Sequence, residues 1–239
     1  MIGTGNSSFC IDGNALDAKV NPANLSSIEN ISFFATPYKF ELTELSSYEL
    51  SYNRNIRFFD FGTRFSIYGF DLYKEFTFGL TIARYITNSL KAGININYHR
   101  VVIKNYGSDG SVSLDLGLNY LLNNYLSFGF SWINFNNASI GGDNLDQEVN
   151  FGISISPLEH LILFSRIEKN ILFKPSLNFG LELLINDMFS FRAGMNSNPE
   201  MIFTGLGLKY SVNSFDYAVS YHNVLGLSHS FSLSWDFEK

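Results

Sequence analysis

Five isolated charges are the best candidates for a functional site in this sequence, because each stands among small or apolar residues. If their side chains point into the protein, each must pair with an opposite charge or meet water, since burying a lone ion is costly. The first interpretation is a network of internal salt bridges that braces the fold. The alternative is a set of charges that tunes solute passage through an interior space. The five residues are Asp60, Arg64, Asp115, Glu182 and Arg192.

No arrangement of residues predicts catalysis. The four histidines have no spacing typical of metal ligands, and His222 and His229 flank a predicted loop. Because Cys10 is the single cysteine, an internal disulfide and a cysteine zinc site are excluded, and we expect a small buried residue there. Gly205 and Gly207 lack a phosphate-binding context and predict a close approach of the main chain or a bend in a strand. We expect no enzyme activity, no catalytic residue, no cofactor and no metal site.

The composition narrows the class of protein. Of 239 residues, 16% are charged, against roughly 25% in a usual soluble domain, and 16% are aromatic. Such a chain has few charges with which to cover a surface that faces water. The formal net charge of −6 argues against a nucleic-acid partner, because phosphate binding needs a basic surface. No run of about 18 apolar residues predicts a transmembrane helix.

Side-chain types alternate strictly along much of the chain. Between residues 90 and 99, apolar and aromatic residues occupy the even positions, whereas small, polar or charged residues occupy the odd ones. Because successive side chains of a strand point to opposite faces, this period of two predicts half-buried strands. The same pattern recurs at residues 112–120, 126–132, 149–155, 177–185 and 230–237.

The polar face of these strands separates a membrane barrel from a soluble β-sandwich. A soluble sheet presents Lys, Glu, Arg and Thr to water, whereas this face consists mostly of Ser, Gly and Asn. Small polar residues fit the inside of a closed barrel, and the large apolar residues then face lipid. Several predicted strands are about 10 to 12 residues long, which is sufficient to cross a bilayer when tilted.

Turn-forming residues divide the chain into about fourteen strands joined by short and longer connections in alternation. Tight turns are predicted at residues 123–124, 157–158, 186–187 and 213–214, and longer links at 104–110, 136–146, 169–174, 196–200 and 223–227. This rhythm is typical of bacterial outer-membrane barrels and places both chain ends on the periplasmic side. The predicted strands are 29–37, 46–53, 57–69, 75–86, 90–103, 111–121, 125–135, 147–156, 159–168, 175–185, 188–196, 201–212, 215–222 and 228–237.

The first 28 residues do not alternate and are compatible with a short helix that ends before Pro22. Two interpretations stay open, a flexible leader and a hatch folded into the barrel lumen. The predicted fold is therefore all-β, a single transmembrane antiparallel barrel (residues 29–239) with an N-terminal plug segment (residues 1–28). No cleavable signal peptide is visible at residues 1–5. The sequence is thus a mature form, begins too late, or belongs to a protein in another location.

The stretch Asn21-Pro22-Ala23-Asn24-Leu25, just before the first predicted strand, resembles the N-terminal segment of the long-chain fatty-acid transporter (FadL) superfamily. Residues 221–233 are similar to the last hairpin of such proteins. Within the superfamily, the chain looks most like the PorV/PorQ-type proteins of type IX secretion. The resemblance implies a fourteen-stranded barrel with an N-terminal plug that contains the stretch Asn21–Leu25.

Three functional hypotheses follow. The resemblance and the narrow, small-residue interior favour a component of a secretion or envelope protein assembly in the outer membrane of a Gram-negative (diderm) bacterium. The alternative is FadL-like transport of small hydrophobic molecules, which needs an apolar pocket in the lumen and a gap in the wall. The third hypothesis is a soluble β-protein. The expected partners are membrane lipid and other envelope proteins, a hydrophobic small molecule in the transport alternative, and no nucleic acid.

Overall fold

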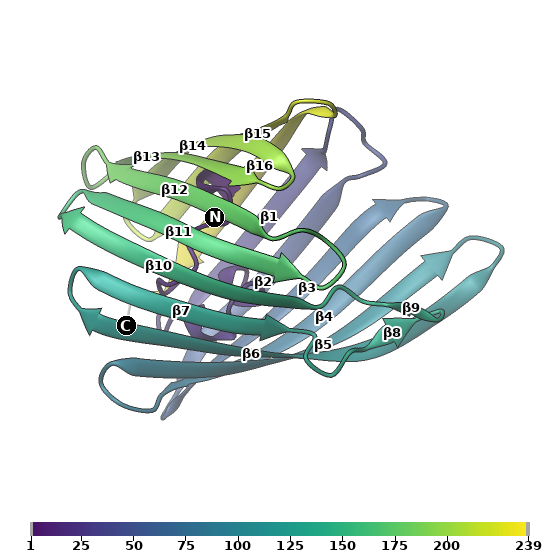
Figure 1. The fold of residues 1–239 in the computed structure, drawn as a ribbon, viewed down its shortest axis with the longest axis horizontal. Coiled ribbons are helices and arrows are strands. Elements are labelled where there is room, and N and C mark those ends of the chain that lie inside the picture. Colours follow the sequence, from purple (N-terminus) through teal and green to yellow (C-terminus); the bar gives the residue numbers. More distant parts are fainter. Residues whose placement is uncertain (1, 238–239) are drawn as a thin grey trace.

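The computed structural model describes residues 2–237 and consists almost entirely of β-strands (Figure 1). Fourteen strands form one closed antiparallel barrel, and a small hairpin of two further strands lies outside the ring. The barrel strands are β1 Asn30–Tyr38, β2 Ser47–Ile56, β3 Phe59–Phe70, β4 Tyr73–Tyr85, β5 Leu90–Ile103, β6 Gly107–Asn123, β7 Leu126–Ile133, β10 Glu148–Leu158, β11 Leu161–Asn170, β12 Ser176–Leu184, β13 Phe189–Ser197, β14 Glu200–Tyr210, β15 Asn213–His222 and β16 Gly226–Asp236. The hairpin strands are β8 Ser139–Ile140 and β9 Asp143–Asn144.

Each barrel strand pairs with its neighbours along the chain, and β1 closes the ring against β16. In this closing pair, Asn30 lies opposite Asp236 and Ser32 opposite Ser234. Strand β7 pairs directly with β10, because the chain between them forms the β8–β9 hairpin. The predicted all-β barrel of about fourteen strands is confirmed, and every predicted strand overlaps one strand of the ring.

The outer surface of the barrel is formed by apolar side chains, whereas the inner surface is formed mostly by small and polar ones. On β5, Ile94 and Ile96 are 48% and 47% exposed, and Asn95 and Asn97 beside them are 1% and 4% exposed. This arrangement is the reverse of a soluble protein, in which large apolar side chains are most often buried. It is the arrangement of a barrel whose outer wall contacts lipid.

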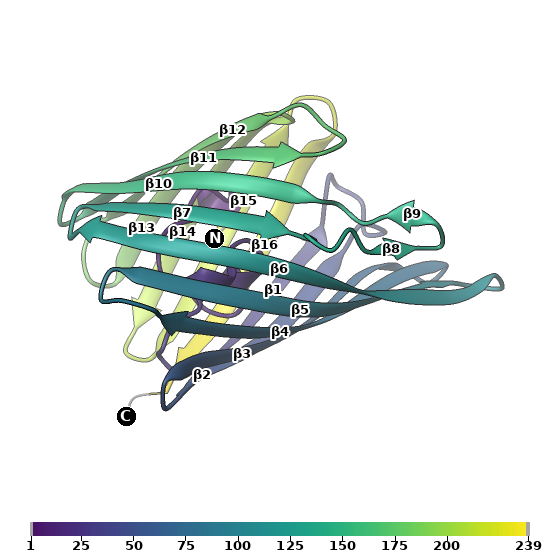
Figure 2. The ribbon, with the colours of Figure 1, turned by 60° about the horizontal axis from the view of Figure 1, so that its bottom comes forward.

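The two ends of the barrel differ in their connections (Figure 2). At the end where the chain enters β1 and leaves β16, each turn contains two to four residues. We call this the short-turn end. The opposite end, which we call the loop end, carries the longest connections, residues 39–46 and 134–147.

Two of the predicted longer links are wrong. Residues 107–110 are not a loop, because they continue the pairing of β6 with β5, in which Asp109 lies opposite Val101. The link at 196–200 shrinks to two residues, because β13 and β14 stay paired as far as Ser197 and Glu200. Turn-forming residue types therefore do not end a strand where a neighbouring strand still offers pairing.

Two predicted tight turns are displaced along the chain. Residues 157–158 belong to β10, where the register shifts between Ile155 and Leu158 and Pro157 is accommodated in the irregularity. The turn itself falls on residues 159–160. Between β14 and β15 the turn lies at residues 211–212, where Ser211 has a left-handed φ of 53°.

Residues 2–28, which we call the N-terminal segment, lie inside the ring of strands (Figure 1). The segment contains three single-turn 3₁₀ helices, η1 Ile2–Thr4, η2 Asp17–Lys19 and η3 Pro22–Asn24. The short helix expected before Pro22 corresponds to η2. Among residues 2–237, no helix is long and apolar enough to cross a membrane.

A charge placed on the outer wall tests whether that wall faces lipid. For Ile94→Arg we expect a loss of about 2–4 kcal/mol in the free energy of unfolding in phospholipid vesicles, because arginine near the bilayer centre is poorly solvated. Ile86→Arg, in the turn between β4 and β5, should cost at most about 1 kcal/mol, because it lies near the interface. Denaturant titration in vesicles measures both values. Equal losses for the two variants would contradict a lipid-facing wall.

Candidate functional site

Facing pairs of inward glycines provide the space that the N-terminal segment occupies. A side chain at any of these positions would overlap the segment. We call the three pairs the glycine seats, and glycine is required at them because another stretch of main chain approaches closely. The seats are Gly93 opposite Gly117, Gly129 opposite Gly152, and Gly180 opposite Gly194.

Each glycine seat holds a different stretch of the N-terminal segment. A methyl group at Gly93 or Gly117 would overlap Pro22, one at Gly129 or Gly152 would overlap Phe9, and one at Gly180 or Gly194 would overlap Thr4. The seats lie on β5–β6, β7–β10 and β12–β13, so the segment is held from several sides of the ring. The close approach predicted at Gly205 is confirmed, because Gly3 lies against it.

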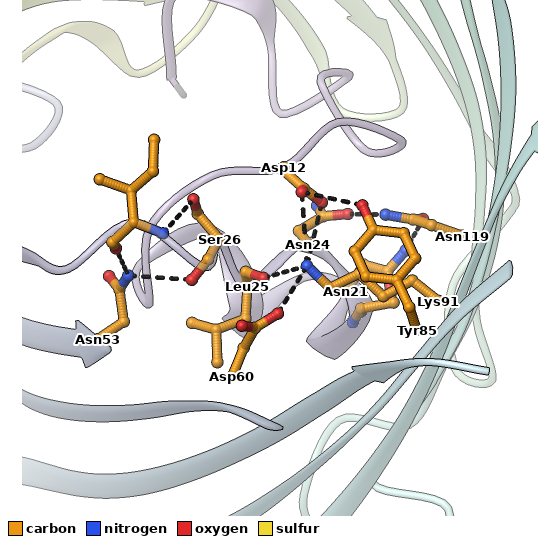
Figure 3. Close-up of polar contacts among 12 residues, drawn as sticks. Asp12, Asn21, Asn24, Leu25, Ser26, Asn53, Asp60, Tyr85, Lys91 and Asn119 are labelled. Carbon is orange, nitrogen blue, oxygen red and sulfur yellow. Dashed lines mark hydrogen bonds and ion pairs between the residues drawn. The ribbon is translucent and has the colours of Figure 1, made fainter. Parts of the chain in front are cut away.

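Carboxamide groups hold the stretch Asn21–Leu25 against β6 (Figure 3). Asn21 Oδ1 accepts a hydrogen bond from Ala23 N at 3.0 Å and so caps η3, with Pro22 in the favoured first position. Asn21 Nδ2 donates to Asn119 Oδ1 at 2.7 Å, and Asn119 Nδ2 donates to Asn24 Oδ1 at 2.6 Å. Both asparagines of the predicted plug motif therefore bind one residue of the wall.

Lys91 is the most densely partnered charge inside the barrel (Figure 3). Its side chain is nearly fully buried, and its Nζ lies 3.0 Å from Asp60 Oδ2 and 4.9 Å from the ring centroid of Tyr85. The same ammonium donates to Leu25 O at 2.5 Å and to Asp12 Oδ1 at 3.4 Å. Burial raises the pKa of the Asp12 carboxyl, and the charge of Lys91 opposes that rise. One ammonium on β5 thus joins β3 and β4 to two points of the N-terminal segment.

The five charges predicted from the sequence do not form one network. Asp60 belongs to the Lys91 group just described. Glu182 and Arg192 lie together, with 2.7 Å between Glu182 Oε1 and Arg192 Nε. Arg192 also pairs with Asp216 on β15. This second group joins β12, β13 and β15 on the side of the barrel opposite Lys91 (Figure 1).

Arg64 and Asp115 form a third group, which is connected through an amide. Arg64 Nη2 donates to Asn97 Oδ1 at 3.3 Å, and Asn97 Nδ2 donates to Asp115 Oδ2 at 2.7 Å. Asp115 Oδ1 accepts from the backbone N–H of Asn134 at 2.9 Å and so fixes the start of the loop after β7. Asn95 bonds Asp115 Oδ2 at 3.1 Å and the Ala18 carbonyl at 2.8 Å, which links this group to the N-terminal segment.

Sequence reasoning missed several charges that line the same interior. Each occupies an inward position of its strand, so the alternation could have identified them. For example, Lys91 shares its face of β5 with Asn95 and Asn97, and Glu49 lies opposite the inward Phe34. The missed residues are Glu49, Lys91, Arg166, Glu168 and Asp216.

Phe9 and Cys10 fill the seat formed by Gly129 and Gly152. The guanidinium carbon of Arg166 lies 5.7 Å from the ring centroid of Phe9, which is within the range of a cation–π contact. Burial raises the pKa of the Cys10 thiol to about 12, so the thiol stays neutral. The prediction of a small buried residue at Cys10 is confirmed.

A cavity of about 520 Å³ lies between the N-terminal segment and the wall formed by β1, β2 and β12–β16. Apolar side chains such as Leu16, Val20 and Phe34 line part of it. Its three basic lining residues are Lys19, Arg192 and Lys209. Its seven acidic lining residues are Asp12, Asp17, Glu49, Glu182, Asp187, Asp216 and Asp236. The excess of acidic residues favours cations within this cavity.

An apolar groove of about 610 Å³ adjoins the cavity on the outer side of β13–β16. Ile185, Leu206 and Phe215 line only this groove and not the cavity. Because the two spaces share residues, they lie against the same part of the wall, near the short-turn end, where β13, β14 and β15 stay paired. The residues that line both are Phe189, Ser190, Gly207, Leu208, Tyr217 and Phe231.

Solved structures of outer-membrane barrels share the fold of this chain. No protein-family model matches the chain, and no curated protein matches it either. A solved structure of a TodX monoaromatic hydrocarbon channel variant superposes with a TM-score of 0.73 and 11% identity, covering 94% of this chain and 95% of that one. The toluene transporter TodX of Pseudomonas putida gives 0.66 at 11% identity, with 95% of each chain covered.

A FadL homologue from Pseudomonas aeruginosa gives a TM-score of 0.62 at 11% identity, covering 97% of this chain and 96% of that one. The structural neighbours are thus FadL-type barrels. This chain has the same fold as these barrels. The likeness spans the whole barrel, and the identity is too low to carry residue roles from one protein to the other.

Removing the Lys91 ammonium should loosen the N-terminal segment and destabilise the barrel. For Lys91→Met we expect a loss of about 3–5 kcal/mol in the free energy of unfolding, because the buried Asp60 carboxylate would lose its charge partner. Adding Asp60→Asn to this variant should recover part of the loss, since no unpaired charge would remain. Denaturant unfolding of the two single variants and the double variant measures the coupling. Strictly additive losses would contradict the proposed pairing.

A side chain in a glycine seat should displace the N-terminal segment. In Gly117→Val the new side chain would overlap Asn21 and Pro22, so we expect trypsin to cleave after Lys19 faster than in the wild type. Ser111→Val lies on the same inner face of β6 toward the loop end and serves as the matched control. Equal cleavage rates in Gly117→Val and wild type would contradict the role of the seat.

Proposed function

We propose that this chain is an outer-membrane channel for small, largely apolar molecules, closed by its N-terminal segment. Two observations support the proposal. The outer wall exposes large apolar side chains throughout the barrel, which suits a membrane protein of a diderm bacterium. The fold is shared with TodX, which is named as a toluene transporter and a monoaromatic hydrocarbon channel.

The observation that carries the proposal is the apolar groove on the outer wall, which lies against the same strands as the internal cavity. The two spaces lie on opposite sides of β13–β16, and Ser190, Arg192 and Asp216 cover the inner side of Gly207. In this proposal the wall between them opens for an apolar molecule, which remains in apolar surroundings on the outer side. Transport of small hydrophobic molecules was the alternative hypothesis from the sequence, and the structural neighbours favour it over a secretion component.

The proposed closure is performed by a plug, the N-terminal segment. Its seating on three glycine pairs and its bonds to Lys91 and Asn119 support this assignment. We propose the plug as residues 1–28 and the barrel as residues 29–239. Of these, Met1, Glu238 and Lys239 lie outside the described residues. In this proposal, the charges at Asp60, Arg64, Asp115, Glu182 and Arg192 brace the wall and the plug.

A component of a secretion or envelope assembly is the second candidate function. The filling of the middle of the lumen by the N-terminal segment favours it, because a docking barrel needs no open path. Apolar side chains at the tips of two connections at the loop end offer further contacts: Leu172 is 72% exposed and Val224 is 80% exposed. The resemblance to PorV/PorQ-type proteins rests on short motifs and stays a prediction.

Filling the outer groove should block transport without changing the lumen. Leu206 points outward into the groove, so Leu206→Trp should reduce uptake of radiolabelled toluene several-fold in diderm cells that express the protein. Ile202→Trp, outward on the same strand but outside the groove lining, should transport like wild type. If cells that express the wild-type protein take up no more toluene than cells that lack it, the channel proposal is contradicted. Wild-type uptake by Leu206→Trp would contradict the route through the wall.

A further inference from the structure

The geometry points to an ammonium-binding site inside the cavity, formed by Glu49 and Phe34 and occupied by the side chain of Lys19. We propose that a small apolar molecule that carries an ammonium group can take the place of Lys19. The proposed ligands are alkyl- and arylammonium ions. The inference rests on the proposed channel only for the route by which a ligand arrives.

Glu49 supplies a buried carboxylate at the edge of the cavity. The residue is 8% exposed, and its Oε1 accepts a hydrogen bond from Lys19 Nζ at 2.6 Å. Its Oε2 accepts no hydrogen bond from the described residues, and Arg64 Nη1 lies 3.8 Å away. A buried carboxylate oxygen is costly to leave without a donor. Glu49 can therefore accept a further hydrogen bond from an ammonium ligand.

Phe34 supplies an aromatic face beside this carboxylate. It lies on the inner face of β1 directly opposite Glu49 on β2, although most inward positions of the barrel hold small or polar residues. Lys19 Nζ lies 5.7 Å from the centroid of the Phe34 ring, within the range of a cation–π contact. A carboxylate and an aromatic face are the two elements that together recognise an ammonium ion.

Lys19 behaves as a tethered ligand of this site rather than as a fixed part of it. Its side chain is 38% exposed, whereas that of Glu49 is 9% exposed. The glycine seats and the Lys91 group hold the N-terminal segment independently of Lys19. The cavity that all three residues line contains Leu16 and Val20, which can cover the apolar part of a ligand. Its excess of acidic residues attracts a cation.

Calorimetric titration of the purified protein in detergent tests the inference with benzylammonium as the probe and benzyl alcohol as its neutral counterpart. Lys19→Met removes the tethered competitor, so it should bind benzylammonium about tenfold more tightly than wild type, with no such gain for benzyl alcohol. Adding Glu49→Gln to Lys19→Met should abolish the gain. Adding Phe34→Leu instead should weaken benzylammonium binding several-fold while the carboxylate remains.

Two outcomes would overturn the inference. One is equal affinity of wild type and Lys19→Met for benzylammonium, and the other is an equal gain for benzyl alcohol. The altered gel mobility of the unheated folded barrel shows whether each variant is folded. Loss of the amine site with intact toluene uptake would leave the channel proposal standing. Loss of toluene uptake with intact amine binding would contradict the channel and not this site.

Discussion

The interior of this barrel depends on how closely the main chain of residues 2–28 can approach the strands. A ring of fourteen strands encloses more space than short side chains alone can fill. The chain fills it with its own N-terminal segment, and this requires glycine where that segment approaches the strands most closely, as at the three glycine seats. The apolar side chains, which would form the core of a soluble protein, are then free to cover the outside.

Polar groups inside the barrel follow from the same constraint. The N-terminal segment has little regular secondary structure, so its backbone groups must find partners elsewhere. The wall provides them: Lys91 binds the Leu25 carbonyl, Asn95 binds the Ala18 carbonyl, and Ser131 binds the Val20 carbonyl. The many Asn and Ser residues of the inner face are thus donors for the segment as well as small residues.

The strands could be predicted from the sequence because a period of two is a local property of each segment. Their ends could not, since residues 107–110 carry turn-forming residues and still pair with β5. The alternation along each strand predicted which positions point inward, and it thereby predicted the burial of Asp60 and Asp115. It did not predict their partners, because the pairing of Asp60 with Lys91 depends on the stagger between β3 and β5. The cavity depends on where the segment lies, which no alternation encodes.

We propose above all that the seated N-terminal segment closes the barrel. Single-channel recording in planar bilayers tests it most directly, by comparing the full chain with a chain that lacks residues 2–28. We expect rare or no opening steps for the full chain and a stable, larger conductance for the truncated barrel. The same conductance from two folded barrels would contradict the claim that this segment closes the lumen.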